Sequence, residues 1–100
     1  MVINKIESET TITLEIEGRL DTVTSIQLSG EFDKIFNGTP SNLVLDFKNL
    51  DYISSAGLRV LLTAQKQVTS LGTTMEIVGA NDSVNEVFKI TGFYNILNIT

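Results

Sequence analysis

The stretch "DYISSAGLRVLL", residues 51–62, decides how this sequence folds, because two structural patterns meet inside it. An apolar run that is typical of a strand gives way to a helical pattern, in which apolar residues recur from Leu58 onward at the spacing of an amphipathic helix. Ser54 and Ser55 stand at the junction of the two patterns. The question is whether these serines only begin a helix or also carry the function of the protein.

The segments that precede this junction predict strands. "NLVLDF", residues 42–47, is a short apolar run of the kind found in buried central strands. In "TITLEIEG", residues 11–18, apolar and polar residues alternate, which predicts a strand with one buried and one wet face. "INKIE", residues 3–7, is expected to pair with it as a hairpin across the polar turn at residues 8–10.

Helical spacing separates the predicted strands. One apolar stripe lies between residues 18 and 42 and consists of Leu28, Phe32, Ile35 and Phe36. We expect Asp21 or Thr22 to cap the start of this helix and Asn37–Gly38 to end it. The helix that begins at the two serines is expected to end at Gly72.

The last quarter of the chain repeats the alternation. "MEIVGA", residues 75–80, predicts a strand, a short apolar stripe predicts a helix that ends at Gly92, and "YNILNIT", residues 94–100, predicts a final strand. Strands joined through helices favour parallel pairing with right-handed crossovers. We therefore expect an α/β fold over residues 1–100: a single domain with a mixed, mainly parallel β-sheet, helices packed on one face, and the order β-β-α-β-α-β-α-β.

The composition excludes several classes of function. The 100 residues include no cysteine and no histidine, so a Ser-His-Asp triad, a thiol nucleophile and an ordinary zinc site cannot be built from them. The net charge of −5 disfavours nucleic acid and anionic membranes as partners. "MVINKIESE" lacks the apolar core of a secretory signal, and no apolar run is long enough to span a membrane. We expect a cytoplasmic protein without metal or cofactor.

The serine junction has an ordinary and a functional interpretation. A serine just before a helix is most often an N-cap that accepts a hydrogen bond from a free backbone N–H. The junction also follows the carboxyl end of a predicted central strand, where open α/β sheets usually place their sites. The N-terminus of a helix suits an anion, so a phosphate on an exposed serine could be accommodated there without unfolding the helix.

Other polar residues have ordinary explanations from the sequence alone. Asp46 and Asp51 flank a turn, and turn chemistry explains them better than a metal pair does. The segment at residues 79–81 resembles a phosphate loop only loosely, and Asn81 or Asp82 is better explained as a helix cap. Arg59 is expected on the exposed first turn of the helix, where it could contact an acidic group of a partner.

Three motifs together resemble the STAS domain of bacterial anti-sigma factor antagonists: "YISSAGLRVLL", the preceding "LVLDFKNLD", and "IEGRLDT" near the N-terminus. The resemblance covers nearly the whole chain. It implies that the serine two residues before Gly57, which is Ser55, is the phosphorylation site, and that Asp21 lies near it. The residues expected near the phosphorylation site or at a partner interface are Asp21, Ser54, Ala56, Gly57, Leu58 and Arg59. Many members have Asp where this chain has Ser54, for which we expect a capping or orienting role.

The resemblance implies a switch protein and not an enzyme. Unphosphorylated, such a domain binds a serine kinase that is also an anti-sigma factor, and phosphorylation of Ser55 with ATP releases it. A PP2C-type phosphatase then resets the domain. One alternative is a STAS regulatory module that controls a non-sigma output. A less favoured one is a small enzyme or nucleotide-binding protein that uses Ser55 and Asp21, although no histidine is present to act as a general base.

Overall fold

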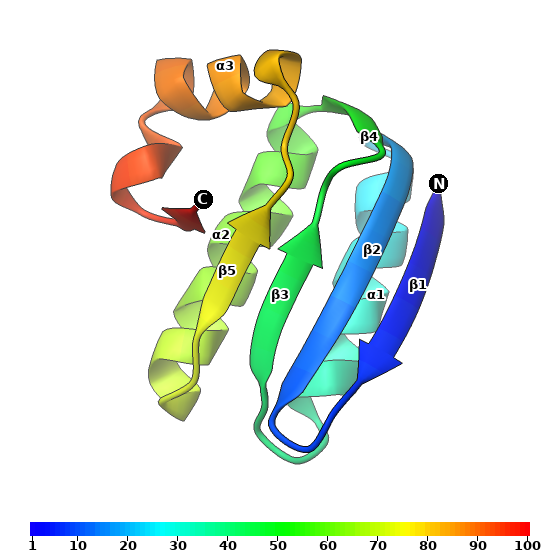
Figure 1. The fold of residues 1–100 in the computed structure, drawn as a ribbon, viewed down its shortest axis with the longest axis vertical. Coiled ribbons are helices and arrows are strands. Elements are labelled where there is room, and N and C mark those ends of the chain that lie inside the picture. Colours follow the sequence, from blue (N-terminus) through cyan, green and yellow to red (C-terminus); the bar gives the residue numbers. More distant parts are fainter.

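The computed structural model describes residues 1–100 and consists of one β-sheet with helices against it (Figure 1). The elements in chain order are β1 (Val2–Glu7), β2 (Thr11–Leu20), α1 (Thr24–Phe36), β3 (Asn42–Asp46), β4 (Leu50–Ile53), α2 (Ser55–Leu71), β5 (Met75–Val78), α3 (Asp82–Thr91), a 3-10 helix (Phe93–Asn95) and β6 (Asn98–Ile99). None of the helices is both long and apolar enough to span a membrane.

The sheet confirms the predicted α/β fold. Its strand order is β1-β2-β3-β5-β6, and β4 pairs with β2 off this path. Strand β1 is antiparallel to β2, as the predicted hairpin requires, and every other pair is parallel. Strand β2 therefore contacts three other strands, with β3 along residues 11–15 and β4 along residues 18–20.

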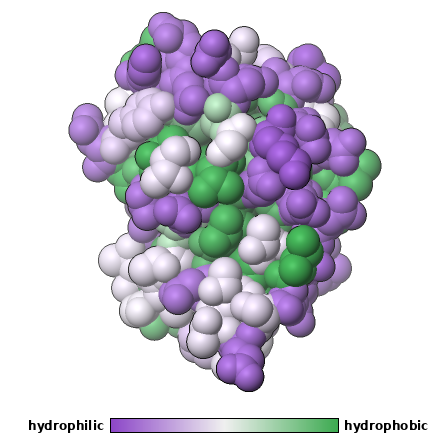
Figure 2. Space-filling view, viewed as in Figure 1, coloured by the Kyte–Doolittle hydropathy of each residue, from purple (hydrophilic) through white to green (hydrophobic).

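Two helices, α1 and α2, lie side by side on one face of the sheet, and α3 lies across its carboxyl end (Figure 1). The alternation predicted for β2 places Ile12, Leu14 and Ile16 in the buried core beneath the helices. Their polar neighbours in the strand are half-buried or exposed on the opposite face. Figure 2 shows this opposite face, where hydrophilic side chains are interspersed with a few apolar ones.

Strand β4 was not part of the predicted element order, although the run before the two serines is typical of a strand. Its burial pattern explains why: Leu50 and Ile53 are buried, whereas Asp51 and Tyr52 between them are exposed, so the segment does not alternate. Its four residues form a strand because they pair with the end of β2, where a register irregularity falls between Gly18 and Arg19. The predicted order of strands and α-helices holds with this one additional strand.

The prediction of a strand over residues 94–100 was wrong for its first half. After α3, Gly92 adopts a left-handed conformation with φ of 75°, and the chain turns into the short 3-10 helix. Hydrogen bonds from the amides of Ile96 and Leu97 to the Phe93 carbonyl hold this turn. Only Asn98 and Ile99 pair with β5.

The predicted helix ends at Gly72 and Gly92 are confirmed. Both glycines are left-handed C-caps, with φ of 74° and 75°. The strand predicted for residues 75–80 is shorter than expected, because β5 ends at Val78 and Gly79 turns with φ of 75°. In the second half of the chain, glycines therefore end the helices where the sequence indicated.

Two glycine substitutions should change stability in opposite directions. Gly30 lies on the exposed side of α1 and Gly72 has positive φ, yet a Cβ added at either meets nothing within 4 Å. Gly30→Ala should stabilise the protein by about 0.5–1 kcal/mol, because alanine favours the helix. Gly72→Ala should destabilise it by roughly 1–2 kcal/mol, because the left-handed conformation strains a side chain. Urea unfolding measures both, and changes of the same sign would contradict the conformational assignment.

Candidate functional site

The serine junction is attached directly to the end of β2. Ile53 at the end of β4 pairs with Leu20, and the Ser54 amide donates a 2.9 Å hydrogen bond to the Leu20 carbonyl. Ser54 has an extended backbone, and its Oγ accepts a 3.2 Å hydrogen bond from the Gly57 N–H. Ser54 is therefore the N-cap of α2, as the ordinary interpretation predicted.

The neighbouring hydroxyl, that of Ser55, differs in its exposure and hydrogen bonding. Ser55 is the first residue of α2, its side chain is exposed, and its Oγ makes no hydrogen bond within the chain. The first turn of α2 contains no acidic residue. Of the two adjacent hydroxyls, that of Ser54 accepts a hydrogen bond from the backbone, whereas that of Ser55 is exposed and makes no hydrogen bond within the chain.

Close packing at the junction explains the glycine in the first turn. Gly57 is buried, and a Cβ at this position would lie 2.8 Å from Leu20 Cγ and 3.1 Å from Ile53 Cγ1. The next residue, Leu58, points into the core. The absence of a side chain at Gly57 thus lets the start of α2 contact the ends of β2 and β4.

Asp21 caps the first turn of α1. Its Oδ1 accepts hydrogen bonds from the backbone amides of Val23 and Thr24, at 3.0 and 2.9 Å. In return, the Thr24 hydroxyl accepts a 2.8 Å bond from the Asp21 amide, which makes the arrangement reciprocal. Asp21, and not Thr22, is therefore the capping residue. Because Leu20 pairs with Ile53, Asp21 and Ser54 leave the sheet side by side.

Hydrogen bonding keeps the Asp21 carboxylate charged. The hydrogen bond from the Thr24 amide is the largest cause that holds the pKa of Asp21 below its ordinary value of 3.8. The Thr24 hydroxyl, the Val23 amide and the positive charge of Arg19 act in the same direction, while desolvation opposes them. A permanent negative charge therefore stands next to the serine junction at neutral pH.

A cation–π pair lies on β2 and β4, just before the junction, and the sequence did not predict it. The Arg19 guanidinium lies 4.2 Å from the centre of the Tyr52 ring, because β2 and β4 make these residues register partners. Tyr52 remains 41% exposed. No local sequence signal indicates this pair, since it depends on the long-range pairing of β4 with β2.

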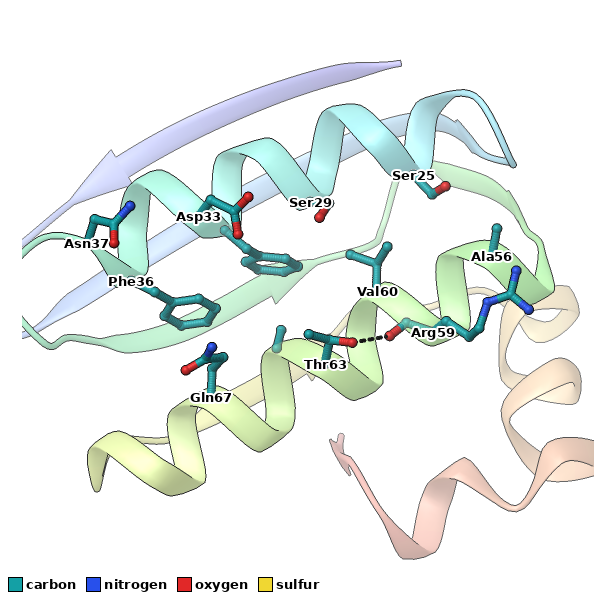
Figure 3. A pocket seen from close by; sticks show the side chains of 12 residues that line it. Ser25, Ser29, Asp33, Phe36, Asn37, Ala56, Arg59, Val60, Thr63 and Gln67 are labelled. Carbon is teal, nitrogen blue, oxygen red and sulfur yellow. Dashed lines mark hydrogen bonds between the residues drawn. The ribbon is translucent and has the colours of Figure 1, made fainter.

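A groove runs between α1 and α2 from the junction toward the other end of the sheet (Figure 3). Its volume is about 500 Å³, Phe32 and Val60 are among the residues that line it, and Ala56 and Arg59 form the end next to the start of α2. Ser55 does not line it. Near the start of α1, Val23 and Ile26 are 76% and 73% exposed. Apolar surface is therefore available beside the junction.

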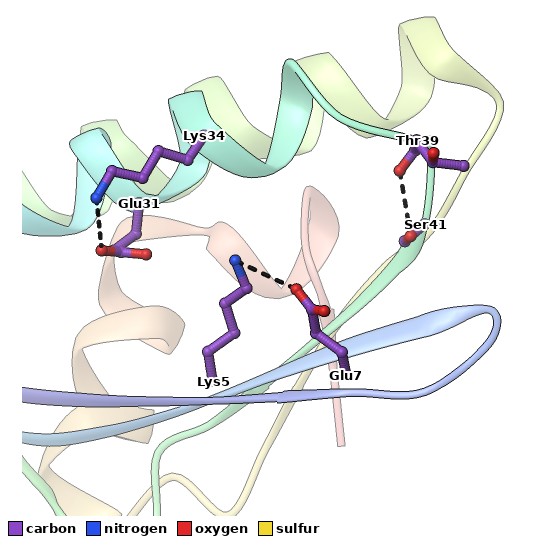
Figure 4. A network of polar contacts seen from close by, with 6 residues as sticks. All are labelled: Lys5, Glu7, Glu31, Lys34, Thr39 and Ser41. Atoms are coloured by element: carbon purple, nitrogen blue, oxygen red, sulfur yellow. Dashed lines mark hydrogen bonds and ion pairs between the residues drawn. The ribbon is translucent and has the colours of Figure 1, made fainter.

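The other polar features are structural. Asp46 Oδ1 accepts a 3.0 Å hydrogen bond from the Lys48 amide, which is the turn chemistry predicted for it, and Asn81 caps α3 by accepting from Val84. The polar contacts in Figure 4 gather at the opposite end of the sheet. They include the ion pairs Lys5–Glu7 and Glu31–Lys34, at 3.3 and 3.5 Å. Exposed pairs of this kind contribute at most about 1 kcal/mol each.

The chain is similar to a known family and to known proteins. The family model described as STAS domain matches residues 2–100. BtrV of Bordetella bronchiseptica, named as an anti-sigma factor antagonist, is 34% identical over 84 residues, which cover 84% of this chain and 72% of BtrV. A Thermotoga maritima structure, also named as an anti-sigma factor antagonist, matches with a TM-score of 0.90 at 20% identity, covering 97% of this chain and 84% of that one.

The anti-sigma factor antagonist SpoIIAA has been solved in two states that both match. The unphosphorylated form gives a TM-score of 0.78 at 15% identity over 99% of this chain and 87% of that chain. The phosphorylated form, from Bacillus, gives 0.77 at 16% identity over 99% of this chain and 91% of that chain. At these identities the similarity establishes the fold, and it extends over nearly the whole chain.

Removing the Ser54 cap should weaken the start of α2. Ser54→Ala is expected to lower the free energy of unfolding by about 0.5–2 kcal/mol, because the Gly57 amide loses its partner. Ser54→Asp should keep the stability, since a carboxylate also caps and favours the positive end of the helix. Urea unfolding measures both variants. Ser70→Ala, an exposed serine on the same helix, is the control, and an equal loss there would refute the capping role.

Asp21 should make stability depend on pH in a defined direction. Because its pKa is lowered in the folded chain, the ionised carboxyl stabilises the fold above the unfolded pKa, and this contribution is lost as pH falls through the folded pKa. Compared with Asp21→Asn, the wild type should therefore lose its advantage between about pH 5 and pH 2. Urea unfolding across this range measures the difference. A difference that stays constant with pH would contradict the assignment.

Proposed function

The chain belongs to the STAS domain family, and on this basis we propose that it is an anti-sigma factor antagonist in a partner-switching circuit. Unphosphorylated, it binds a serine kinase that also acts as an anti-sigma factor, which frees the sigma factor. The kinase phosphorylates Ser55 with ATP and the complex dissociates. A PP2C-type phosphatase restores the binding form. The circuit operates in the cytoplasm and involves neither nucleic acid nor membrane contact by this chain.

The observation that carries the proposal is the difference between the two adjacent serines. Ser54 Oγ accepts a hydrogen bond from the Gly57 amide, whereas Ser55 is exposed and its hydroxyl makes no hydrogen bond within the chain. A kinase needs an accessible hydroxyl, which favours Ser55 as the acceptor. This choice agrees with the position two residues before Gly57 that the family pattern implies.

The chemistry around Ser55 supports a switch that acts through charge. A phosphate adds roughly −1.5 to −2 charges and would stand at a helix N-terminus, which tolerates an anion. A partner surface that fits a neutral hydroxyl would have to desolvate this charge without a matching donor, which costs binding free energy. Asp21, already ionised beside the junction, adds to the negative potential that the partner would face.

The relatives support the same function. BtrV shares about a third of its aligned residues with this chain and is named as an anti-sigma factor antagonist. SpoIIAA matches this chain about equally well in its phosphorylated and unphosphorylated forms, so this fold accommodates the modification without a change of architecture. The chain itself need not catalyse a reaction, because in this circuit the partners add and remove the phosphate.

The test begins with the partner. The wild type and Ser55→Ala are used to capture proteins from the native cell, and the kinase that is retained is identified by mass spectrometry and purified. Incubation with ATP and peptide fragmentation then locate the phosphate. We expect it on Ser55, and phosphate found only on Ser54 would overturn the assignment of the acceptor.

Variants at Ser55 should separate binding from switching. Ser55→Ala should bind the kinase and remain bound in the presence of ATP, whereas Ser55→Asp should bind about a hundredfold more weakly, which corresponds to about 3 kcal/mol. Calorimetric titration measures both affinities. Ser70→Asp, which adds the same charge to an exposed serine at the far end of α2, is the matched control. Equal weakening by Ser70→Asp would show that net charge, and not the junction, controls binding.

A further inference from the structure

Arg59 stands one helical turn after Ser55. Both side chains are exposed on α2, and residues four positions apart on a helix have Cβ atoms about 5–6 Å from each other. Side chains on a helix lean toward its N-terminus. Figure 3 shows the Arg59 side chain extended in this direction, beside Ala56 and toward the start of α2. Its guanidinium is therefore within reach of a group attached to Ser55 Oγ.

The Arg59 guanidinium has no partner in the chain. The three ion pairs of the structure involve Lys5, Lys34 and Lys48. The only side-chain hydrogen bond that involves residue 59 goes from the Thr63 hydroxyl to the Arg59 backbone carbonyl. The other arginine, Arg19, lies over the Tyr52 ring. In a chain with 12 acidic residues and a net charge of −5, Arg59 is an uncommitted cation.

We propose that Arg59 binds the phosphate on Ser55 and holds it against the first turn of α2. This inference rests on the proposed phosphorylation of Ser55. A guanidinium presents a planar set of donors that matches two phosphate oxygens at once, and no acidic residue in the first turn competes for it. Arg59 is a positioning residue here, since it fixes the phosphate after the transfer.

The contact has a consequence for regulation. In the unmodified chain Arg59 is free to face an acidic group of a partner. In the phosphorylated chain the same guanidinium is occupied. Phosphorylation then changes the surface twice, because it adds negative charge at Ser55 and withdraws a positive group one turn away.

The phosphate can be tested without any kinase. The chain is produced with phosphoserine encoded at position 55, and the second pKa of its phosphate, ordinarily near 6, is measured by phosphorus NMR. Arg59→Gln should raise this pKa by about half a unit relative to the wild type, since the dianion loses its cation. Arg59→Lys should restore most of the difference. In the wild type, the chemical shift of the Arg59 Nε–H should change with pH over the same range in which the phosphate titrates.

A matched control removes the same charge elsewhere on the helix. Lys66→Gln acts 11 residues after Ser55, about 16 Å along the helix axis, and should leave the phosphate pKa unchanged in physiological salt. The charged groups on the neighbouring elements are the same in all variants: Arg19 on β2, Asp21 before α1, Asp51 on β4 and Asp82 at the start of α3. Their effects on the phosphate pKa are therefore the same in every variant and do not contribute to the differences between variants.

The outcomes separate this inference from the proposed function. The role of Arg59 would be overturned if the phosphate pKa is the same in the wild type and Arg59→Gln and the Arg59 Nε–H chemical shift does not change with pH. This result would leave the kinase circuit standing. A kinase that avoids Ser55 would overturn the circuit, while the titration would still report on the contact. Equal shifts in Arg59→Gln and Lys66→Gln would also refute the inference, because they would indicate a general charge effect.

Discussion

The contact between Leu20 and the start of α2 is the interaction on which the rest of the structure depends. Leu20 is fully buried, and its carbonyl accepts a hydrogen bond from the Ser54 amide. Its side chain occupies the space that a Cβ on Gly57 would need. The same residue pairs with Ile53 and precedes Asp21, the cap of α1. One residue at the end of β2 thus sets the starts of both helices that cover the sheet.

Periodicity and capping chemistry were sufficient to predict most of the fold. Ser54, Asn81 and Gly72 end or begin helices where the sequence indicated, because caps depend on neighbours within four residues. Strand β4 and the Arg19–Tyr52 pair were not predictable in this way, since each exists only through pairing between distant segments. The turn after Gly92 was missed because its apolar residues resemble a strand.

The candidate site was indicated more fully. The sequence and its resemblance to a family pointed to the junction, with a capping role for Ser54 and the phosphate on Ser55. The hydrogen bond from the Gly57 amide to Ser54 confirms the cap, and the phosphate on Ser55 stays a prediction. In the proposed function, two tasks therefore fall to adjacent serines. Ser54 caps the helix and Ser55 carries the phosphate, so that phosphorylation leaves the cap in place.

The pairing of β4 with β2 makes the junction a conformational epitope. Leu20 and Ile53 are 33 positions apart in the sequence, so Asp21 and Ser54 become neighbours only after this long-range contact has closed. An unfolded chain contains the same serines but neither the capped helix start nor the adjacent carboxylate. A partner that recognises this junction would therefore discriminate folded from unfolded copies, and a short peptide with the sequence of residues 51–62 would be a poor substitute for the domain.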